Sequence, residues 1–207
     1  MKEYVTIGNA EYTIENVIEK SRFIASAIHV DTVEQAAAFV ESKRKKYYDA
    51  THNCYAYIVG DKAKFSDDSE PQGTAGMPML EVLRANDLRE TAVVVTRYFG
   101  GIKLGAGGLV RAYSGCVAEN IAAAKKVLYQ TCAESDYAVD YPEVDAALRF
   151  FGKEDCNVIA TDYSDKVIFK VAVKKEREAN FNAALNDFLN GKVTIEKKRE
   201  YFFPFEV

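Results

Sequence analysis

The sequence predicts an α+β protein of two domains, and three observations carry this prediction. Segments typical of strands alternate with segments typical of helices from residue 12 onward. After residue 127 the order becomes strand, helix, strand, strand, helix, strand, which is the ferredoxin-like βαββαβ arrangement. Charge divides at the same place, because residues 1–128 carry 16 Lys and Arg against 16 Asp and Glu, whereas the rest carry 11 against 15. We therefore expect domains at residues 1–129 and 130–207.

The first domain is expected to begin with a β-hairpin and a helix. Residues 12–20 and 22–30 are rich in Thr, Ile, Val and Phe with poor helical spacing, which is typical of strands. A capping box at Thr32 to Gln35 predicts a helix that ends in the basic residues 43–46. Because cations at a helix C-terminus complement the helix dipole, we interpret these residues as a solvated cap rather than a binding patch.

The middle of the chain predicts two strands and two helices. Residues 52–59 are typical of a strand, and a polar loop leads from there to a helix that opens at residues 74–78. Residues 91–97 are apolar on both faces, which predicts a central strand buried on both sides. A glycine-rich turn follows, and the apolar spacing from Leu109 to about Val127 predicts a long helix.

Six segments make up the predicted second domain, and each has the residue pattern of its element. In chain order we expect strand 128–141, helix 144–153, a hairpin of 157–164 and 166–175, helix 178–191 and strand 193–203.

Composition excludes several classes of protein. The net charge of −4 excludes binding of nucleic acid by bulk charge, so any polyanion site must be local and lie within residues 1–128. Four cysteines without a Cys-x-x-Cys pair indicate reduced thiols, and only two histidines argue against a metal site rich in histidine. The N-terminal residues do not resemble a signal peptide, and no apolar run is long enough for a membrane helix. We expect a cytoplasmic protein that binds no membrane.

The strongest local feature is the turn at residues 97–111, where a buried strand runs into five glycines and a helix. Glycines let backbone N–H groups point at one centre, and a helix N-terminus adds a positive dipole end, so this turn could hold a phosphate. The alternative is a tight turn in which the glycines serve packing alone. Neither the P-loop nor the dinucleotide fingerprint is matched, because Leu104 follows the lysine and Val110 stands where a glycine is needed. The candidate phosphate or RNA ligands are Arg97, Lys103, Gly105, Gly107, Gly108 and Arg111, with Thr74 and Gly76 from the preceding helix start.

An acidic loop precedes that helix start. Asp67, Asp68 and Glu70 are weak candidates for holding a magnesium ion, and they could equally pair with arginine or be solvated. No fixed ligand spacing is present, so we expect no metal and no cofactor.

Strand alternation places His52 and Cys54 on one face and Tyr55 and Tyr57 on the other. A nucleophile and base pair is one interpretation of the first two, but their face is otherwise apolar, which favours core residues. The tyrosines could stack on RNA bases, or a helix could cover them. We assign no catalytic residue.

Four motifs occur in order, namely Lys20-Ser21-Arg22-Phe23, Thr51-His52-Asn53-Cys54-Tyr55-Ala56-Tyr57, the run from Asp67 to Pro78, and the run from Thr96 to Gly105. Together they resemble the IMPACT/YigZ family and its bacterial branch. Ser69 is one small departure, since the family more often has glycine there.

The resemblance implies an N-terminal β-α-β two-layer sandwich, similar to a small-subunit ribosomal protein domain and to domain IV of elongation factor G. It implies a C-terminal domain similar to the ferredoxin-like domain V of that factor. The eukaryotic relative regulates, by protein contact, the kinase that controls translation initiation during amino-acid starvation. No catalytic residues are implied.

We therefore expect a non-catalytic regulator or accessory factor of translation that binds RNA, the ribosome or a translation-regulatory protein, without DNA sequence specificity. One alternative is an enzyme acting on a phosphorylated small molecule or nucleotide through the glycine-rich loop. Another is a pure protein-interaction module.

Overall fold

A computed structural model describes residues 3–206 of the chain. The chain folds into two compact units, an N-terminal unit of residues 4–128 with Glu206 and a C-terminal unit of residues 129–205 with Glu3. Among the described residues, no helix combines the length and the apolar character needed to span a lipid bilayer.

The N-terminal unit is built around an antiparallel sheet with strand order β2-β3-β6-β4-β5. The predicted hairpin is present, with the turn at Glu19 and Lys20 between its two strands. The sheet strands are β2 (Tyr12–Ile18), β3 (Ser21–His29), β4 (His52–Val59), β5 (Lys62–Ser66) and β6 (Thr91–Tyr98), and a short β1 (Tyr4–Ile7) pairs with β7 (Lys126–Val139).

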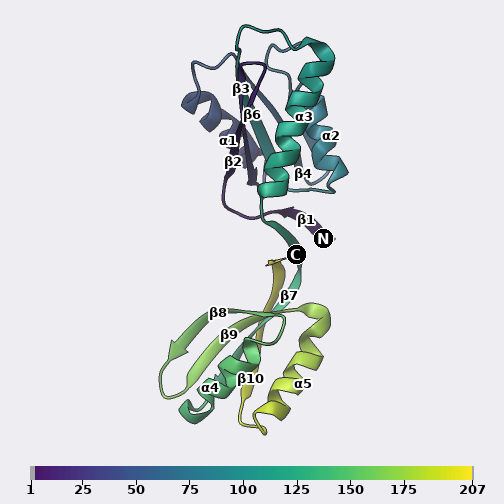
Figure 1. The fold of residues 1–207 in the computed structure, drawn as a ribbon. Coiled ribbons are helices and arrows are strands. Elements are labelled where there is room, and N and C mark those ends of the chain that lie inside the picture. Colours follow the sequence, from purple (N-terminus) through teal and green to yellow (C-terminus); the bar gives the residue numbers. More distant parts are fainter. Residues whose placement is uncertain (1–2, 207) are drawn as a thin grey trace. The chain divides into compact units, whose positions relative to one another are not determined.

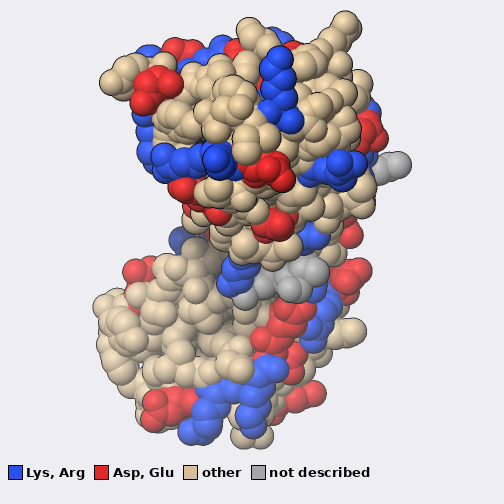
Figure 2. Space-filling view, turned by 45° about the horizontal axis from the view of Figure 1, so that its top comes forward, with Lys and Arg blue, Asp and Glu red and all other residues tan. Residues whose placement is uncertain are grey.

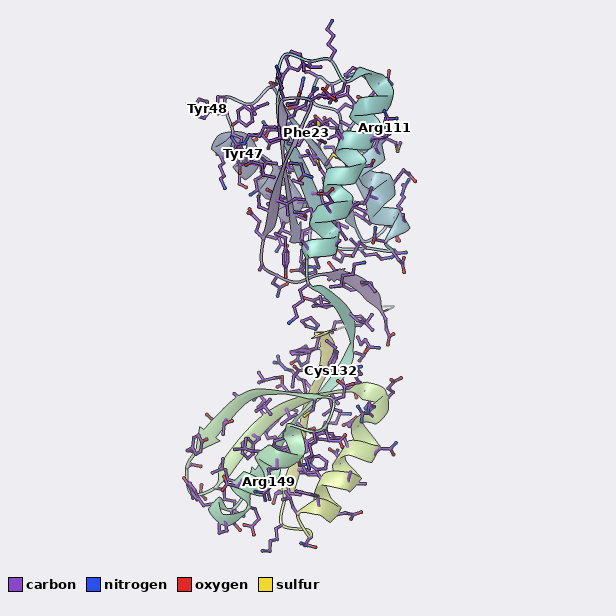
Figure 3. The ribbon with its side chains drawn as sticks, in the orientation of Figure 1. Phe23, Tyr47, Tyr48, Arg111, Cys132 and Arg149 are labelled. Atoms are coloured by element: carbon purple, nitrogen blue, oxygen red, sulfur yellow. The ribbon has the colours of Figure 1, made fainter. Side chains whose placement is uncertain are left out.

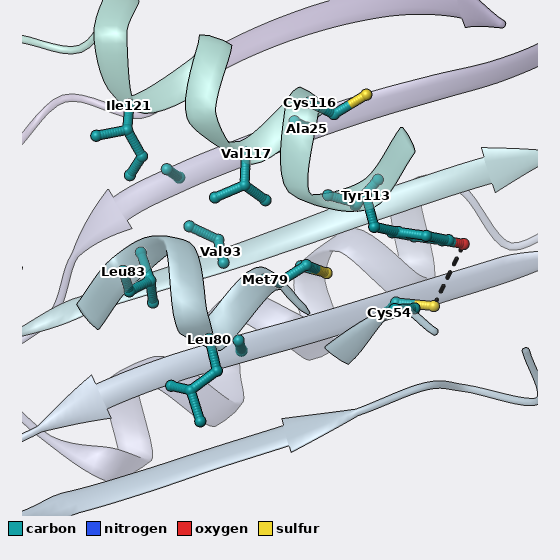
Figure 4. Packing of buried hydrophobic residues seen from close by; sticks show 14 of the residues in the cluster. Ala25, Cys54, Met79, Leu80, Leu83, Val93, Tyr113, Cys116, Val117 and Ile121 are labelled. Carbon is teal, nitrogen blue, oxygen red and sulfur yellow. Dashed lines mark hydrogen bonds between the residues drawn. The ribbon is translucent and has the colours of Figure 1, made fainter. Parts of the chain in front are cut away.

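Helices cover both faces of this sheet (Figure 1). On one face α2 (Gly76–Ala85) and α3 (Gly105–Ala123) pack on Ala25, Cys54 and Val93, as the close view in Figure 4 shows. On the other face α1 (Val33–Lys46) packs on Tyr57, Val59, Ala92 and Val94. The two-layer sandwich expected for this domain is therefore wrong, and the unit has three layers.

The physical reason for the third layer lies in β6. Its residues are apolar on both faces, and all from Thr91 to Arg97 are buried, so a helix layer on only one side would leave half of them in water. This confirms the prediction of a central strand. The predicted capping box of α1 is present in a shifted form: Thr32 Oγ1 accepts the Gln35 N–H at 3.2 Å, and the Gln35 side chain accepts the N–H of Asp31 at 2.6 Å rather than that of Thr32.

The C-terminal unit has the element order βαββαβ, with strand order β10-β7-β9-β8. Its helices α4 and α5 lie on the same face of the sheet (Figure 1) and enclose an aromatic core that includes Tyr137, Phe151 and Phe169. The elements after β7 are α4 (Val144–Phe151), β8 (Cys156–Tyr163), β9 (Val167–Lys174), α5 (Glu178–Phe188) and β10 (Thr194–Glu206), with single 3₁₀ turns at Tyr141–Glu143 and Lys175–Arg177.

Candidate functional site

A buried ion pair lies between the N-terminal sheet and α3. Arg97, near the end of β6, donates a hydrogen bond from Nη1 to Oε1 of Glu70 at 2.7 Å, and both side chains are almost wholly buried. The Nη2 atom contacts Ser21 Oγ at 3.2 Å, and the guanidinium lies over the Phe23 ring. Of the three interpretations of the acidic loop, pairing with arginine is confirmed for Glu70. Arg97 is consequently buried and ion-paired within the unit, so its charge is not available to a phosphate site on the surface.

The same glutamate contacts α3 and lies close to the motif that contains His52 and Cys54. Tyr113 on α3 donates its hydroxyl hydrogen to Glu70 Oε1 at 2.8 Å, and Cys54 lies 3.4 Å from that hydroxyl (Figure 4). His52 Nδ1 donates to the carbonyl oxygen of Asp68 at 2.8 Å, and its Nε2 atom is 3.8 Å from Glu70. Glu70 is thus bonded to Arg97 and Tyr113 and lies close to His52, while Ser21 of the first motif reaches this buried cluster through Arg97.

The thiol of Cys54 has the environment of a core residue. Its side chain is fully buried and its Sγ contacts the Asp67 carbonyl oxygen at 3.0 Å. Burial raises the pKa of the thiol far above its ordinary value, and the nearby carboxylates of Glu70 and Asp68 raise it further. A thiol held neutral in this way is a poor nucleophile, so the core interpretation of the Cys54 face is supported.

Asp67 caps the start of α2. Its carboxylate accepts three backbone N–H groups, from Gly73 at 2.8 Å, Ala75 at 3.0 Å and Gly76 at 2.8 Å. Gly76 also packs directly on the backbone of Ser66, since a Cβ atom at position 76 would lie only 2.8 Å from it. Thr74 is buried as well and bonds to the Pro71 carbonyl. This helix start is thus already occupied by a carboxylate of the chain itself.

Asp68 and Ser69 form the tight bend of the acidic loop. Both have left-handed backbone conformations, with φ of +43° and +69°. The Asp68 carboxylate accepts the Asn53 N–H at 2.6 Å and lies 3.4 Å from Arg44 Nη2. With Asp67, Asp68 and Glu70 all engaged in these contacts, the described residues contain no cluster of His, Cys, Asp or Glu suited to a metal ion.

A groove of about 430 Å³ lies at the start of α3 and contains both remaining cations of the predicted phosphate site. Lys103 and Arg111 are exposed, and neither has an acidic partner within residues 3–206. Figure 3 shows Arg111 on the α3 helix. The groove is completed mostly by apolar residues of the same loop and of the β2–β3 turn, and its lining is Ile18, Glu19, Ile102, Lys103, Leu104, Gly108, Arg111 and Ala112.

The backbone at this groove requires glycine at particular positions. A Cβ atom on Gly100 would lie 2.0 Å from the carbonyl group of Lys20, so the loop can approach the β2–β3 turn only without a side chain. Gly105 begins α3 with φ of +70°, a conformation that favours glycine. No side chain caps α3, and its first turn, which includes Gly107 and Gly108, has no acidic residue. The structure therefore brings together Lys103, Gly108 and Arg111, with Gly105 and Gly107 in the same turn.

The two tyrosines of β4 lie on the opposite face of the sheet, against α1. Their rings are nearly parallel, with centroids 6.2 Å apart, and Tyr57 is only 5% exposed. The alternative in which a helix covers them is confirmed for Tyr57, whereas Tyr55 is only partly buried. They share no surface with the groove at α3.

Charge is distributed without a single large basic surface on the face seen in Figure 2, where Lys and Arg are interspersed with Asp and Glu. Any contact with phosphate on that face is local, as the composition requires.

Comparison with protein-family models and comparison with related sequences identify the same family. Residues 19–121 match the model of the Impact N-terminal domain, and residues 138–192 match a domain of unknown function, DUF1949. The IMPACT family member YvyE of Bacillus subtilis (strain 168) is 39% identical over 208 residues, which span 95% of this chain and 92% of that protein. The chain belongs to the IMPACT family.

Other relatives agree with this membership. The IMPACT family member YigZ of Escherichia coli (strain K12) is 39% identical over 91% of this chain and 95% of its own. The crystal structure of a hypothetical protein superposes with a TM-score of 0.61 at 37% identity, covering 96% and 98% of the two chains. The structure of the two-domain translational regulator Yih1 is 29% identical over 56% of this chain and 46% of its own, but its TM-score of 0.34 is too low to count towards this agreement.

Sequence reasoning did not anticipate the roles of Tyr113 and Ser21 in the buried cluster. Tyr113 lies within the apolar spacing that predicts α3, and that spacing says nothing about its hydroxyl group. The available signal was a phenol in the middle of that face, because a buried tyrosine hydroxyl usually has a hydrogen-bond partner.

Proposed function

We propose that this IMPACT family member is a cytoplasmic, non-catalytic regulator or accessory factor of translation that contacts RNA or the ribosome through the groove at the start of α3. Family membership supports the translation-related role, since the resemblance implies regulation of translation for the eukaryotic member. The observation that carries the site is the pair of exposed cations, Lys103 and Arg111, beside a helix start without a capping side chain.

The test is the double change Lys103→Ala and Arg111→Ala in the full chain. We expect weaker co-sedimentation with ribosomes, because two phosphate contacts are lost. The slope of log affinity against log salt should become shallower by about 1.4–1.8, corresponding to two phosphates at roughly 0.7–0.9 each.

A matched control is available in the C-terminal unit. Arg149 (Figure 3) and Lys153 are exposed on and just after α4, and changing both to alanine alters the net charge equally. This control should keep normal co-sedimentation and salt dependence. Equal loss in both double variants would show a bulk charge effect, and no loss in the groove variant would refute the site.

We also propose the finer domain assignment, with an IMPACT-type domain at residues 1–129 and a ferredoxin-like domain, similar to domain V of elongation factor G, at residues 130–207. The strand order β10-β7-β9-β8 of the C-terminal unit supports the second of these.

A further inference from the structure

A second groove lies on the opposite face of the N-terminal sheet, between α1 and the edge strand β5. Its volume is about 340 Å³, within the range of roughly 300–1,000 Å³ typical of small-molecule sites. The helix packs over β4 and β6 and leaves this edge of the sheet uncovered. The lining residues are Ala37, Val40, Glu41 and Arg44 from α1, Tyr55 and Tyr57 from β4, and Lys64 from β5.

The floor of this groove contains a buried polar side chain without a partner. Tyr57 is 95% buried, yet within residues 3–206 its hydroxyl has no hydrogen bond. The hydroxyl itself is not enclosed and reaches the groove, where it is available to donate a hydrogen bond to a ligand. Tyr55, nearly parallel to it, extends the aromatic surface.

Two cations and one carboxylate surround the aromatic floor. Lys64 lies directly opposite Tyr57 in the β4–β5 pairing and has no acidic partner among the described residues. The Arg44 guanidinium lies 5.8 Å from the centre of the Tyr55 ring, and its only ion pair in the described chain is the long contact to Asp68 at 3.4 Å. Glu41, between Arg44 and the apolar Val40, offers an acceptor for a hydroxyl or amino group.

We propose that this groove binds a mononucleotide unit, in which a base and its sugar carry a phosphate group. The base lies against the partly exposed Tyr55 ring beside Val40, and the phosphate contacts Lys64 and Arg44. Glu41 accepts a hydrogen bond from the sugar or from an exocyclic amine, and Tyr57 donates one. The unit is either a free nucleotide or one nucleotide of an RNA strand.

Calorimetric titration of the full chain tests this proposal, using AMP, GMP, CMP, UMP, adenosine, inorganic phosphate and a five-nucleotide RNA. We expect saturable binding of at least one mononucleotide. Tyr57→Phe should weaken it about fivefold, as expected for one hydrogen bond. Lys64→Gln should weaken the mononucleotide but not adenosine. Lys62→Gln removes the same charge from the same strand outside the groove and is the matched control.

The RNA arm distinguishes the two sources. Binding of the RNA alone, sensitive to Tyr57→Phe, would assign the groove to an RNA strand, and binding of free nucleotides would assign it to a small molecule. No binding of any nucleotide or RNA at millimolar concentration would overturn the proposal. So would inorganic phosphate binding as tightly as AMP, or variants without effect. The Lys103 and Arg111 double variant should keep nucleotide binding. The proposal for this groove and the proposal for the groove at α3 can therefore be refuted independently.

Discussion

Replacing Arg97 with methionine should destabilise the N-terminal unit by about 3–5 kcal/mol, the usual cost of removing one partner from a buried ion pair. The structure favours this range because Glu70 is 97% buried as a side chain and would keep only the Tyr113 hydroxyl as a close donor. An exposed pair would instead contribute roughly 0–1 kcal/mol. The same change also removes the guanidinium from between the rings of Phe23 and Phe99.

Hydrogen exchange followed by mass spectrometry across a urea titration measures this free energy, because it resolves the two units separately. Peptides covering β6 report the N-terminal unit, and peptides covering β9 serve as an internal control. A second variant, Glu70→Gln with Arg97→Met, should lose less than the sum of the two single changes, since no buried charge is then left unpaired. A decrease in the free energy of unfolding of less than about 1 kcal/mol for Arg97→Met would refute the reasoning, because an exposed ion pair contributes that much.

The remaining predictions concern two glycines and one carboxylate. Gly100→Ala should destabilise the N-terminal unit by about 1–3 kcal/mol because its Cβ would meet the Lys20 backbone at 2.0 Å, whereas Gly107→Ala, with only Arg111 Nη1 near at 3.8 Å, should stabilise α3 by about 0.5–1 kcal/mol. The same exchange measurement ranks them, and a reversed order would contradict the packing. Hydrogen bonds from Lys175 and Lys197 lower the pKa of Glu200 from 4.5 to about 2. Its contribution to the stability of the C-terminal unit is therefore complete above pH 4.5 and lost as pH falls towards about 2. Acid titrations of the wild type and of Glu200→Gln should differ over this window, and identical curves would argue against the role.

Hydrophobic pattern was sufficient for most of the fold. The central strand followed from apolar residues on both of its faces, and α1 followed from a capping box that the structure contains. The C-terminal elements followed from alternation and helical spacing. These patterns are local in the sequence, so they can be recognised without knowledge of tertiary contacts.

Two elements could not be read in this way. Strand β5 is short and alternates lysine with small or aromatic residues, so it resembles a polar loop until its pairing with β4 is known. Helix α3 begins at Gly105, four residues before the expected Leu109, because glycine is a poor helix former and gives no signal in the first turn.

The candidate site was predictable in composition but not in geometry. Lys103 and Arg111 were identified from a glycine-rich turn, and the structure places both in one groove. Arg97 had the same sequence signal, yet it lies in the interior with Glu70, since the depth of a side chain depends on which helix covers the strand. Asp67 likewise became a helix cap through backbone groups that the sequence does not reveal.

The bend at Asp68 and Ser69 bears on how distant relatives are recognised. Both residues have conformations that glycine adopts at lower cost, but the Asp68 carboxylate is needed by Asn53, whereas Ser69 has no side-chain hydrogen bond within residues 3–206. Replacing Ser69 with glycine would therefore lower the free energy needed for the left-handed backbone at this position, and it would remove no side-chain hydrogen bond among the described residues. A sequence pattern that requires glycine at position 69 would therefore miss chains with the same loop and a serine at that position. A pattern that requires aspartate at position 68 would still find them.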